Sequence, residues 1–374
     1  MRPRAAVLVL VLLPVLAGAG CAPVARLPAL DQKAVEAEQR REQIAQMRSY
    51  YAAVHRVDNV AFRIRVANSN FCKDWVSAQI GLYAATPRSL PHRFHSFAAE
   101  ALDLTWARPT VISISDGSPA AAAGIRDHDE IIALDGELIP LTRTAGWMGG
   151  WLKANGVKPV RVDLRRDGVD RTVMVTPVMA CSIPIDYVVD DVVNAGSGDR
   201  GIVINSGIVA LAKTDAQLAV VIGHELAHSN LGHLDKRRLN TVIGFAGGLA
   251  IDAGIMVGGL PTGGAFTREF TKGGARAFSV AFEREADYVG AYYAARAGYD
   301  LNGVEELWWA IGQQSDPNSL RFAKTHPLAP VRFLQMRAVA AEIADKERRH
   351  LPLVPELKTL QAAGEPPAAS PPPP

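Results

Sequence analysis

The residues best suited to chemistry lie between positions 218 and 228. The segment reads Leu-Ala-Val-Val-Ile-Gly-His-Glu-Leu-Ala-His, so an apolar run enters a His-Glu-x-x-His pattern. On a helix, His224 and His228 are four residues apart and share one face, close enough to bind one metal ion. Glu225 lies beside them as a candidate general base. A catalytic zinc takes three protein ligands and leaves a position for water, so the pattern predicts two ligands and the base of a zinc hydrolase.

The sequence offers a carboxylate as the third ligand. In one known zinc arrangement a histidine follows six residues after the second ligand, but position 234 is leucine and His233 misses by one. Farther along, Glu283 and Asp287 are four apart on a second predicted helix, so both can face the metal. We expect Glu283 to ligate zinc and Asp287 to orient a ligand histidine. Glu285 is an alternative ligand that the helical facing disfavours.

Three other interpretations compete with this site. A helix with two incidental histidines is weakened by the apolar surroundings, because buried imidazoles need partners. A solvated charged face over residues 283–287 fits Arg284 and Glu285 better than the other two acids. A purely structural zinc site would use four closed ligands, mostly Cys and His, which differs from this set.

The whole chain has the composition of a globular protein. It has 374 residues, 48% hydrophobic and 21% charged, with a formal net charge of +2. These proportions exclude a disordered, collagen-like or heavily membrane-spanning chain, and the length allows two or three domains. No block of like charge indicates a nucleic-acid partner. The three cysteines are too few for a disulfide-rich scaffold.

The first twenty residues read as an export signal. A basic start precedes an apolar stretch over residues 5–17 and small residues over 18–20, directly before Cys21. This order is typical of a secretory signal, and the apolar part is too short to cross a bilayer as a stable helix. We expect lipidation of Cys21 to anchor the mature chain to a membrane. An ordinary signal with a coincidental cysteine is the alternative.

The junction at Cys21 resembles the lipobox of bacterial lipoproteins, with Gly18 where Leu or Val is usual. The resemblance implies an exported protein on the periplasmic side. Ala22 is not the aspartate associated with retention in the inner membrane. The expected location is therefore the outer membrane of a Gram-negative bacterium.

The middle of the chain has strand-like patterns. Residues 111–115 alternate in polarity, and residues 160–164 and 171–175 flank an Asp-Gly turn. The run Gly-Ser-Pro-Ala-Ala-Ala-Ala-Gly-Ile over 117–125, with a later Asp-Glu-Ile-Ile and Asp-Gly, resembles a bacterial PDZ domain. His128 stands where that family usually has Gly, and His tolerates a positive φ. The resemblance implies either a module that binds extended peptides as an added strand or a packing module that binds nothing.

Two cysteines bracket this PDZ-like region almost symmetrically. Export would place Cys72 and Cys181 in an oxidising compartment, where they can pair. A bridge would join the two chain ends at which the module is inserted, whereas two separate buried thiols are the alternative. Within the module, Ile-Gly-Leu at residues 80–82 is a weak match to the loop that holds a peptide's C-terminal carboxylate.

Around the metal motif the chain resembles the gluzincin peptidases typified by HtpX-like proteases and CAAX prenyl proteases, whose exported lipoprotein members include ones with a PDZ-like insert. The resemblance rests on residues 193–219, on Glu283-x-x-Ala-Asp, and on Thr-His-Pro at 325–327 followed by Arg332. It implies one Zn²⁺, polypeptide substrates, and His326 placed to stabilise an oxyanion or donate a proton. A packing histidine before a proline is the alternative for His326.

These observations predict an α+β protein: a mainly helical, zincin-like gluzincin peptidase domain over residues 182–347, with a small β-rich PDZ-like domain over 72–181 inserted before it. A helical segment over 21–71 follows the signal peptide at 1–20, and a disordered Pro-rich tail spans 348–374.

Two further segments are expected to serve the site. Residues 201–207 could form an edge strand that pairs with extended substrate. Residues 241–260 are apolar and rich in glycine. Because Asp252 would be costly in a bilayer, we expect a mobile lid or membrane-facing patch there, and a spanning helix is the minority alternative.

The predicted function is that of a zinc metalloendopeptidase of the bacterial cell envelope, tethered by its lipid and acting on misfolded or misassembled proteins. The alternative is a periplasmic chaperone or assembly factor that uses the PDZ-like module, with hydrolysis secondary.

Overall fold

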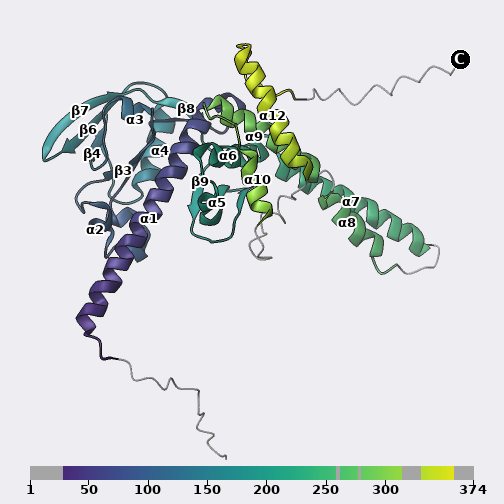
Figure 1. Ribbon diagram of the computed structural model, residues 1–374, viewed down its shortest axis with the longest axis horizontal. Helices are drawn as coiled ribbons and strands as arrows, with labels where there is room; N and C mark the ends of the chain where they lie inside the picture. Colours follow the sequence, from purple (N-terminus) through teal and green to yellow (C-terminus); the bar gives the residue numbers. More distant parts are fainter. Residues whose placement is uncertain (1–27, 258–261, 277–278, 314–329, 358–374) are drawn as a thin grey trace, which may run out of the picture. The chain divides into compact units, whose positions relative to one another are not determined.

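The computed structural model describes residues 28–257, 262–276, 279–313 and 330–357 (Figure 1). The predicted signal peptide, Cys21, His326 and the end of the Pro-rich tail lie outside these residues. The chain divides into two compact units, residues 1–42 and 43–374. Helix α1 (Gln32–Ala67) begins in the first unit, and the rest of the description concerns the second.

The β-rich module is built on one antiparallel sheet with the strand order β2-β3-β4-β6-β7, and β5 pairs with β4. The strands are β2 (Leu82–Ala85), β3 (Thr110–Ile114), β4 (Glu130–Leu134), β5 (Glu137–Leu138), β6 (Val160–Arg166) and β7 (Val169–Val175). The helices of this region are α2 (Ala98–Leu102), α3 (Pro119–Ala122), α4 (Thr144–Asn155) and the short 3₁₀ turns η2 (Pro87–Ser89) and η3 (His92–Phe94). Inward-facing side chains of the sheet, including Val111, Ile131 and Leu164, pack against Trp151 and Leu152 of α4.

Local backbone chemistry explains two of its turns. Asp167 and Gly168 join β6 to β7 with φ of 52° and 78°, the left-handed pair that a tight two-residue hairpin requires. His128 has φ of 69°, so the histidine does adopt the glycine-type conformation expected before β4.

The two ends of this module lie side by side. Strand β1 (Val76–Gln79) pairs antiparallel with β8 (Val178–Cys181), and Val76 lies opposite Cys181. The 3₁₀ turn η1 (Ser69–Phe71) precedes a disulfide between Cys72 and Cys181, whose Cα atoms are 5.6 Å apart. The chain therefore enters and leaves the module at one covalently joined point.

The remaining elements form the helical region around a three-stranded sheet. The sheet has β9 (Ile185–Val188), β10 (Ala195–Gly198) and β11 (Gly201–Asn205) in the order β10-β11-β9. The helices are α5 (Ser206–Leu211), α6 (Asp215–Asn230), α7 (His233–Val257), α8 (Ala265–Arg276), α9 (Ser279–Arg296), α10 (Glu305–Gly312) and α12 (Pro330–Arg348). In this sheet β10 pairs with β11 antiparallel and β9 pairs with β11 parallel. The combination of helices with mainly antiparallel strands is consistent with the predicted α+β class.

One strand expectation is wrong. Residues 201–207 were expected to supply an edge strand, but β11 has β10 on one side and β9 on the other. The short hairpin at Gly198–Gly201 places β10 outside it, so β10 lies at the edge of this sheet. A single strand pattern cannot reveal this order, because order depends on which neighbours fold back onto the strand.

Helix α6 is the centre of the larger core. Thr214 caps it, because its side-chain oxygen accepts a hydrogen bond from the Gln217 amide at 3.2 Å. Residues 217–227 are all buried, which fits a helix that is apolar on every side. Packed with it are Val57, Val60 and Ile64 of α1 and the buried side chains of α9 and α12.

In the segment predicted as a lid or membrane-facing patch, residues 241–257 belong to α7, which packs against α8 as a helical hairpin (Figure 1). Residues 258–260 of that segment lie outside the described residues. The buried Asp252 carboxylate holds the two helices together by accepting hydrogen bonds from the Phe266 and Thr267 amides. Its pKa would be raised by burial, but these bonds and those of the threonine hydroxyls lower it to about 2. Apolar side chains remain exposed on the hairpin, among them Leu239, Val242, Ile243, Phe245, Leu249 and Phe270. Within the described residues, no helix has the length and apolar character needed to span a membrane.

Candidate metal centre

Three predicted ligands converge between α6 and α9. The Nε2 atoms of His224 and His228 are 3.0 Å apart. The two carboxylate oxygens of Glu283 on α9 each lie 3.4 Å from one of these nitrogens, Oε2 from that of His224 and Oε1 from that of His228. His224 and Glu283 are buried and His228 is nearly so. Two imidazoles and a carboxylate therefore point their donor atoms at one small space.

The spacing of these donors suits zinc. Nitrogen and oxygen ligands lie about 2.0–2.2 Å from Zn²⁺ in tetrahedral sites, so two such donors are about 3.3–3.5 Å apart. The two nitrogen–oxygen separations of 3.4 Å lie in that range, and the Nε2–Nε2 separation of 3.0 Å is somewhat shorter. Three ligands from two helices leave a tetrahedral ion one coordination position for water or substrate.

The orientation of His224 is fixed from behind by Asp287. The Nδ1 atom of His224 lies 2.9 Å from an oxygen of Asp287, and both side chains are buried. Burial would raise the pKa of Asp287, but hydrogen bonds from Arg332 and His224 outweigh it and lower that pKa. Asp287 is thus a carboxylate that accepts the Nδ1 hydrogen, and the Nε2 atom of His224 faces the other ligands.

The same interactions affect the protonation of His224. Burial lowers its pKa, but the hydrogen bonds with Asp287 and Glu283 dominate and raise it to about 9. A cation that binds at Nε2 must displace a proton there, so metal uptake at this site is linked to proton release.

Glu225, the predicted general base, is fully buried beside the cluster. Burial lowers the pKa of His228, and the negative charges of Glu225 and Glu283 act against that effect. Glu225 also raises the pKa of Arg332, although more weakly than Asp287 does. Its carboxylate is therefore within electrostatic reach of the donor cluster, as a base acting on a water there must be.

The helices carrying the ligands meet through two glycines. A Cβ on Gly223 would lie 2.5 Å from the Gly290 carbonyl oxygen, and one on Gly290 would lie 2.5 Å from the His224 amide nitrogen. Only glycine permits this approach of two backbones. Sequence reasoning missed Gly290, and its signal was a glycine one turn after Asp287 in an otherwise favourable helix.

His233 is close to the cluster but does not point at it. Its Nδ1 lies 2.9 Å from Nδ1 of His228, and its Nε2 lies 3.0 Å from an oxygen of Glu285. Glu285, the disfavoured alternative ligand, is therefore turned toward His233, away from the metal cluster. Sequence reasoning had considered His233 only as a ligand.

A cavity of about 290 Å³ adjoins His228. Its wall includes the β10–β11 turn at Gly198, Arg200 and the ring of Trp75, and Leu234 of α7 closes another side. Trp75 is 60% exposed. The backbone next to it is held by the amide of Trp75 donating to Cys72 and the amide of Ser182 donating to Trp75.

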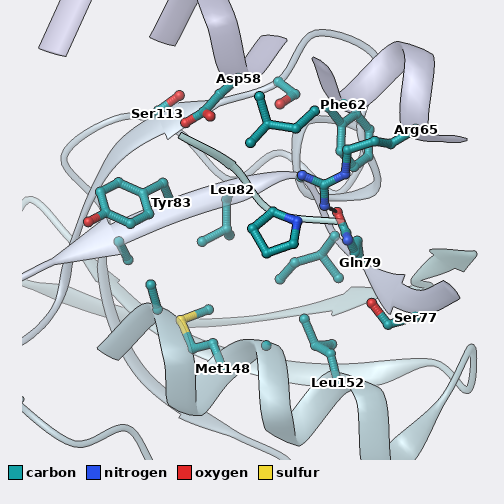
Figure 2. A pocket seen from close by; sticks show the side chains of 18 of the residues that line it. Asp58, Phe62, Arg65, Ser77, Gln79, Leu82, Tyr83, Ser113, Met148 and Leu152 are labelled. Carbon is teal, nitrogen blue, oxygen red and sulfur yellow. Dashed lines mark hydrogen bonds between the residues drawn. The ribbon is translucent and has the colours of Figure 1, made fainter. Parts of the chain in front are cut away.

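A second cavity, of about 610 Å³, is lined by the β-rich module, by α1 and by residues 184–186 (Figure 2). Strand β2 and residues 80–82 form one wall, and Met148 and Leu152 of α4 form the opposite wall. Asp58 and Arg65 of α1 also line it, and Arg65 donates a hydrogen bond to the side chain of Gln79. Burial, assisted by the charge of Asp186, raises the pKa of Asp58 to about 6, although Arg65 opposes the shift.

The comparisons with known proteins support a metallopeptidase. Residues 184–340 match the model of Peptidase family M48. Over 132 residues the chain is 30% identical to the mitochondrial metalloendopeptidase OMA1 of Schizosaccharomyces pombe, a match that covers 34% of this chain. The chain spans 37% of the length of that relative. The family match includes all three candidate ligands, Glu225 and Asp287.

Two solved structures are similar to part of this chain. A crystal structure of the HtrA3 PDZ domain bound to a phage-derived ligand is 19% identical, covering 28% of this chain and 88% of that one, with a TM-score of 0.22. The HtrA-type protease AlgW with a decapeptide is 17% identical, covering 28% of this chain and 30% of that one, also with a TM-score of 0.22.

Proposed function

We propose that this chain is a zinc-dependent metalloendopeptidase, with His224, His228 and Glu283 as the zinc ligands. The observation that supports this most strongly is the convergence of the two Nε2 atoms and the Glu283 carboxylate on one space. Zinc bound there supplies a Lewis acid that polarises a peptide carbonyl and lowers the pKa of water to about 7.

In this proposal the protein residues orient the ligands and move the proton. Asp287 holds the Nδ1 hydrogen of His224, and Arg332 compensates the charge of that buried carboxylate. The Glu225 carboxylate takes a proton from the attacking water and delivers it to the leaving amine nitrogen. The role predicted for His326 in stabilising the oxyanion or donating a proton stays a prediction.

The proposed substrates are polypeptides that bind in an extended conformation. The edge of β10 is open to an added strand in the described sheet, and the cavity that adjoins His228 reaches the turn at its end. Strand addition would give affinity for backbone with little demand on sequence. This arrangement suits a protease acting on misfolded or misassembled proteins.

We also keep as proposals the location and domain organisation predicted from sequence. Removal of residues 1–20 and lipidation of Cys21 would place the protein at the periplasmic side of the outer membrane. The apolar side chains exposed on the α7–α8 hairpin would suit a position close to lipid. A PDZ-like domain over residues 72–181 would be a unit inserted before the peptidase domain.

The cavity in the β-rich module favours a second candidate function. Its size suits a peptide segment, and β2 lies at the edge of its sheet. Capture of peptides there would serve the chaperone or assembly role, with hydrolysis secondary.

Removing the base while keeping the metal separates the two functions. We expect Glu225→Gln to bind one zinc per chain while casein hydrolysis falls by at least about 100-fold. A matched control is Glu269→Gln on the exposed side of α8, which should cleave casein at the wild-type rate. A chelator should abolish cleavage by the wild-type protein, and added zinc should restore it. Full casein hydrolysis by Glu225→Gln would refute the peptidase mechanism.

A further inference from the structure

The two ring nitrogens of His228 have different neighbours: one faces the candidate metal ligands, and the other contacts a second histidine. Nε2 of His228 lies among the ligand atoms, whereas Nδ1 lies 2.9 Å from Nδ1 of His233. The chain reverses between them at Gly232, which has φ of 65°, and α7 begins at His233. This turn brings the two rings together, with centroids 4.9 Å apart.

The position of His233 is fixed by its own neighbours. Its ring is 3% exposed. It stacks on Phe282 of α9, with centroids 4.7 Å apart and an interplanar angle of 18°. Its Nε2 atom lies 3.0 Å from an oxygen of Glu285, which follows Glu283 by two residues on α9. Packing and a charged acceptor therefore hold the ring in one orientation.

The number of donors and acceptors fixes where the hydrogens lie between His228, His233 and Glu285. Two nitrogens 2.9 Å apart share one hydrogen, so one Nδ1 must donate and the other accept. If Nε2 of His228 binds metal, its ring hydrogen is on Nδ1 and donates to His233. The hydrogen of His233 is then on Nε2, where it donates to Glu285.

We propose that His233 and Glu285 are positioning residues that fix the tautomer and orientation of His228 for metal binding. They do for His228 what Asp287 does for His224, but the carboxylate acts through an intervening imidazole. The two supports differ in solvent access, because the side chain of Asp287 is fully buried and that of Glu285 is 40% exposed. The inference rests on the proposed metal site.

The test measures zinc affinity by competition with a chromophoric chelator, without any peptide substrate. Removing a partner behind a ligand histidine typically weakens metal binding 10- to 100-fold. We expect that loss for His233→Phe, which keeps an aromatic ring against Phe282 but cannot accept a hydrogen bond. His233→Gln, whose amide can accept from His228 and donate to Glu285, should recover part of the loss. Arg237→Ala, at an exposed position one turn farther along α7, is the control and should bind zinc as the wild type does.

A double variant separates positioning from general structural damage. Glu285→Gln should weaken zinc binding less than His233→Phe, and it should cause no further loss when His233 is already Phe, because it acts through that ring. The visible spectrum of the Co²⁺-loaded protein should change in His233→Phe and stay unchanged in Arg237→Ala. Near-ultraviolet circular dichroism of each metal-free variant checks that it is folded.

Two results would overturn the inference: a folded His233→Phe variant whose zinc affinity is within twofold of the wild type, or additive effects of the two substitutions. Failure of the proposed function gives a different result. A wild-type protein that binds no zinc refutes the metal site itself, and one that binds zinc without cleaving casein refutes only the peptidase activity.

Discussion

Arg332 and Asp287 form a two-point ion pair behind the metal cluster. Nε and Nη2 of Arg332 lie 2.7 and 2.8 Å from the two oxygens of Asp287, and both side chains are fully buried. The pair joins α12 to α9, so the end of the chain's helical region is tied to the helix that bears Glu283. Arg332 Nη1 also lies 3.4 Å from a Glu283 oxygen.

Breaking this pair should cost both stability and metal binding. Asp287→Ala leaves the Arg332 charge buried without its main partner, which typically costs about 3–5 kcal/mol of unfolding free energy. Urea denaturation of the metal-free protein measures this cost, and chelator competition measures the accompanying loss of zinc affinity.

The exposed pair Arg165–Asp170 provides the matched control for the same charge change. Asp170→Ala should alter the unfolding free energy by less than about 1 kcal/mol, because solvent screens that pair. Equal effects of the two substitutions would contradict the importance assigned to the buried pair.

The contact between Gly223 and Gly290 predicts a second outcome. Gly290→Ala would place a methyl group 2.5 Å from the His224 amide nitrogen, so α6 and α9 must separate. We expect a loss of about 1–3 kcal/mol, as for other overpacked sites, together with weaker zinc binding. Gly150→Ala at an exposed position of α4, where a Cβ meets nothing within 4 Å, should instead stabilise the protein by up to about 1 kcal/mol. Thermal unfolding of both variants with and without zinc tests the opposite signs.

The disulfide at the ends of the β-rich module is expected to stabilise the fold. It closes a loop between residues separated by 109 positions, for which chain entropy predicts about 4–5 kcal/mol and typical measurements give about 2–5. Replacing Cys72 and Cys181 together by Ser should lower the unfolding free energy in that range. Reduction of the wild-type protein should give the same shift, and an unchanged unfolding midpoint in both experiments would rule out the predicted stabilisation.

Asp58 in the larger cavity predicts a pH-dependent effect on stability. Its pKa is raised from 3.8 to about 6 in the folded protein, so folding favours the protonated form. Stability from this group is present below about pH 4 and is lost as the pH rises through 6. Converted in full to unfolding free energy, this pKa shift amounts to about 3 kcal/mol. Because Asp58 lines a cavity open to solvent, we expect a change in unfolding free energy of about 1–2 kcal/mol.

Asp58→Asn should therefore stabilise the protein at pH 7 and have little effect at pH 4. Guanidinium denaturation at the two pH values measures the difference. A gain of the same size at both values would show that the charge of Asp58 is not the cause.

The parts of the site that follow from local helical spacing were predictable from sequence. His224 and His228 share a face because they are four apart, and the same rule selected Glu283 and Asp287. The helix–helix approach that unites the two pairs was not predictable, because it depends on the facing glycines. The contact of His233 with His228 likewise depends on the left-handed turn at Gly232.

For the fold as well, features set by local sequence were predicted correctly, and the order of strands within a sheet was not. Strand patterns around 111–115 and 160–175 correspond to β3, β6 and β7, because alternation of polarity is a local property. The place of β11 inside its sheet depends on β9 and β10 and could not be read from β11 itself.

The contact between Gly223 and Gly290 has a consequence for how such centres vary. Neither residue has a functional group, yet the relative placement of imidazole and carboxylate depends on both staying small. A survey of reactive side chains would pass over them, although a methyl group added at either position would force α6 and α9 apart and so separate His224 from Glu283. In this protein the placement of the His224 imidazole relative to the Glu283 carboxylate depends partly on two residues that have no side chain.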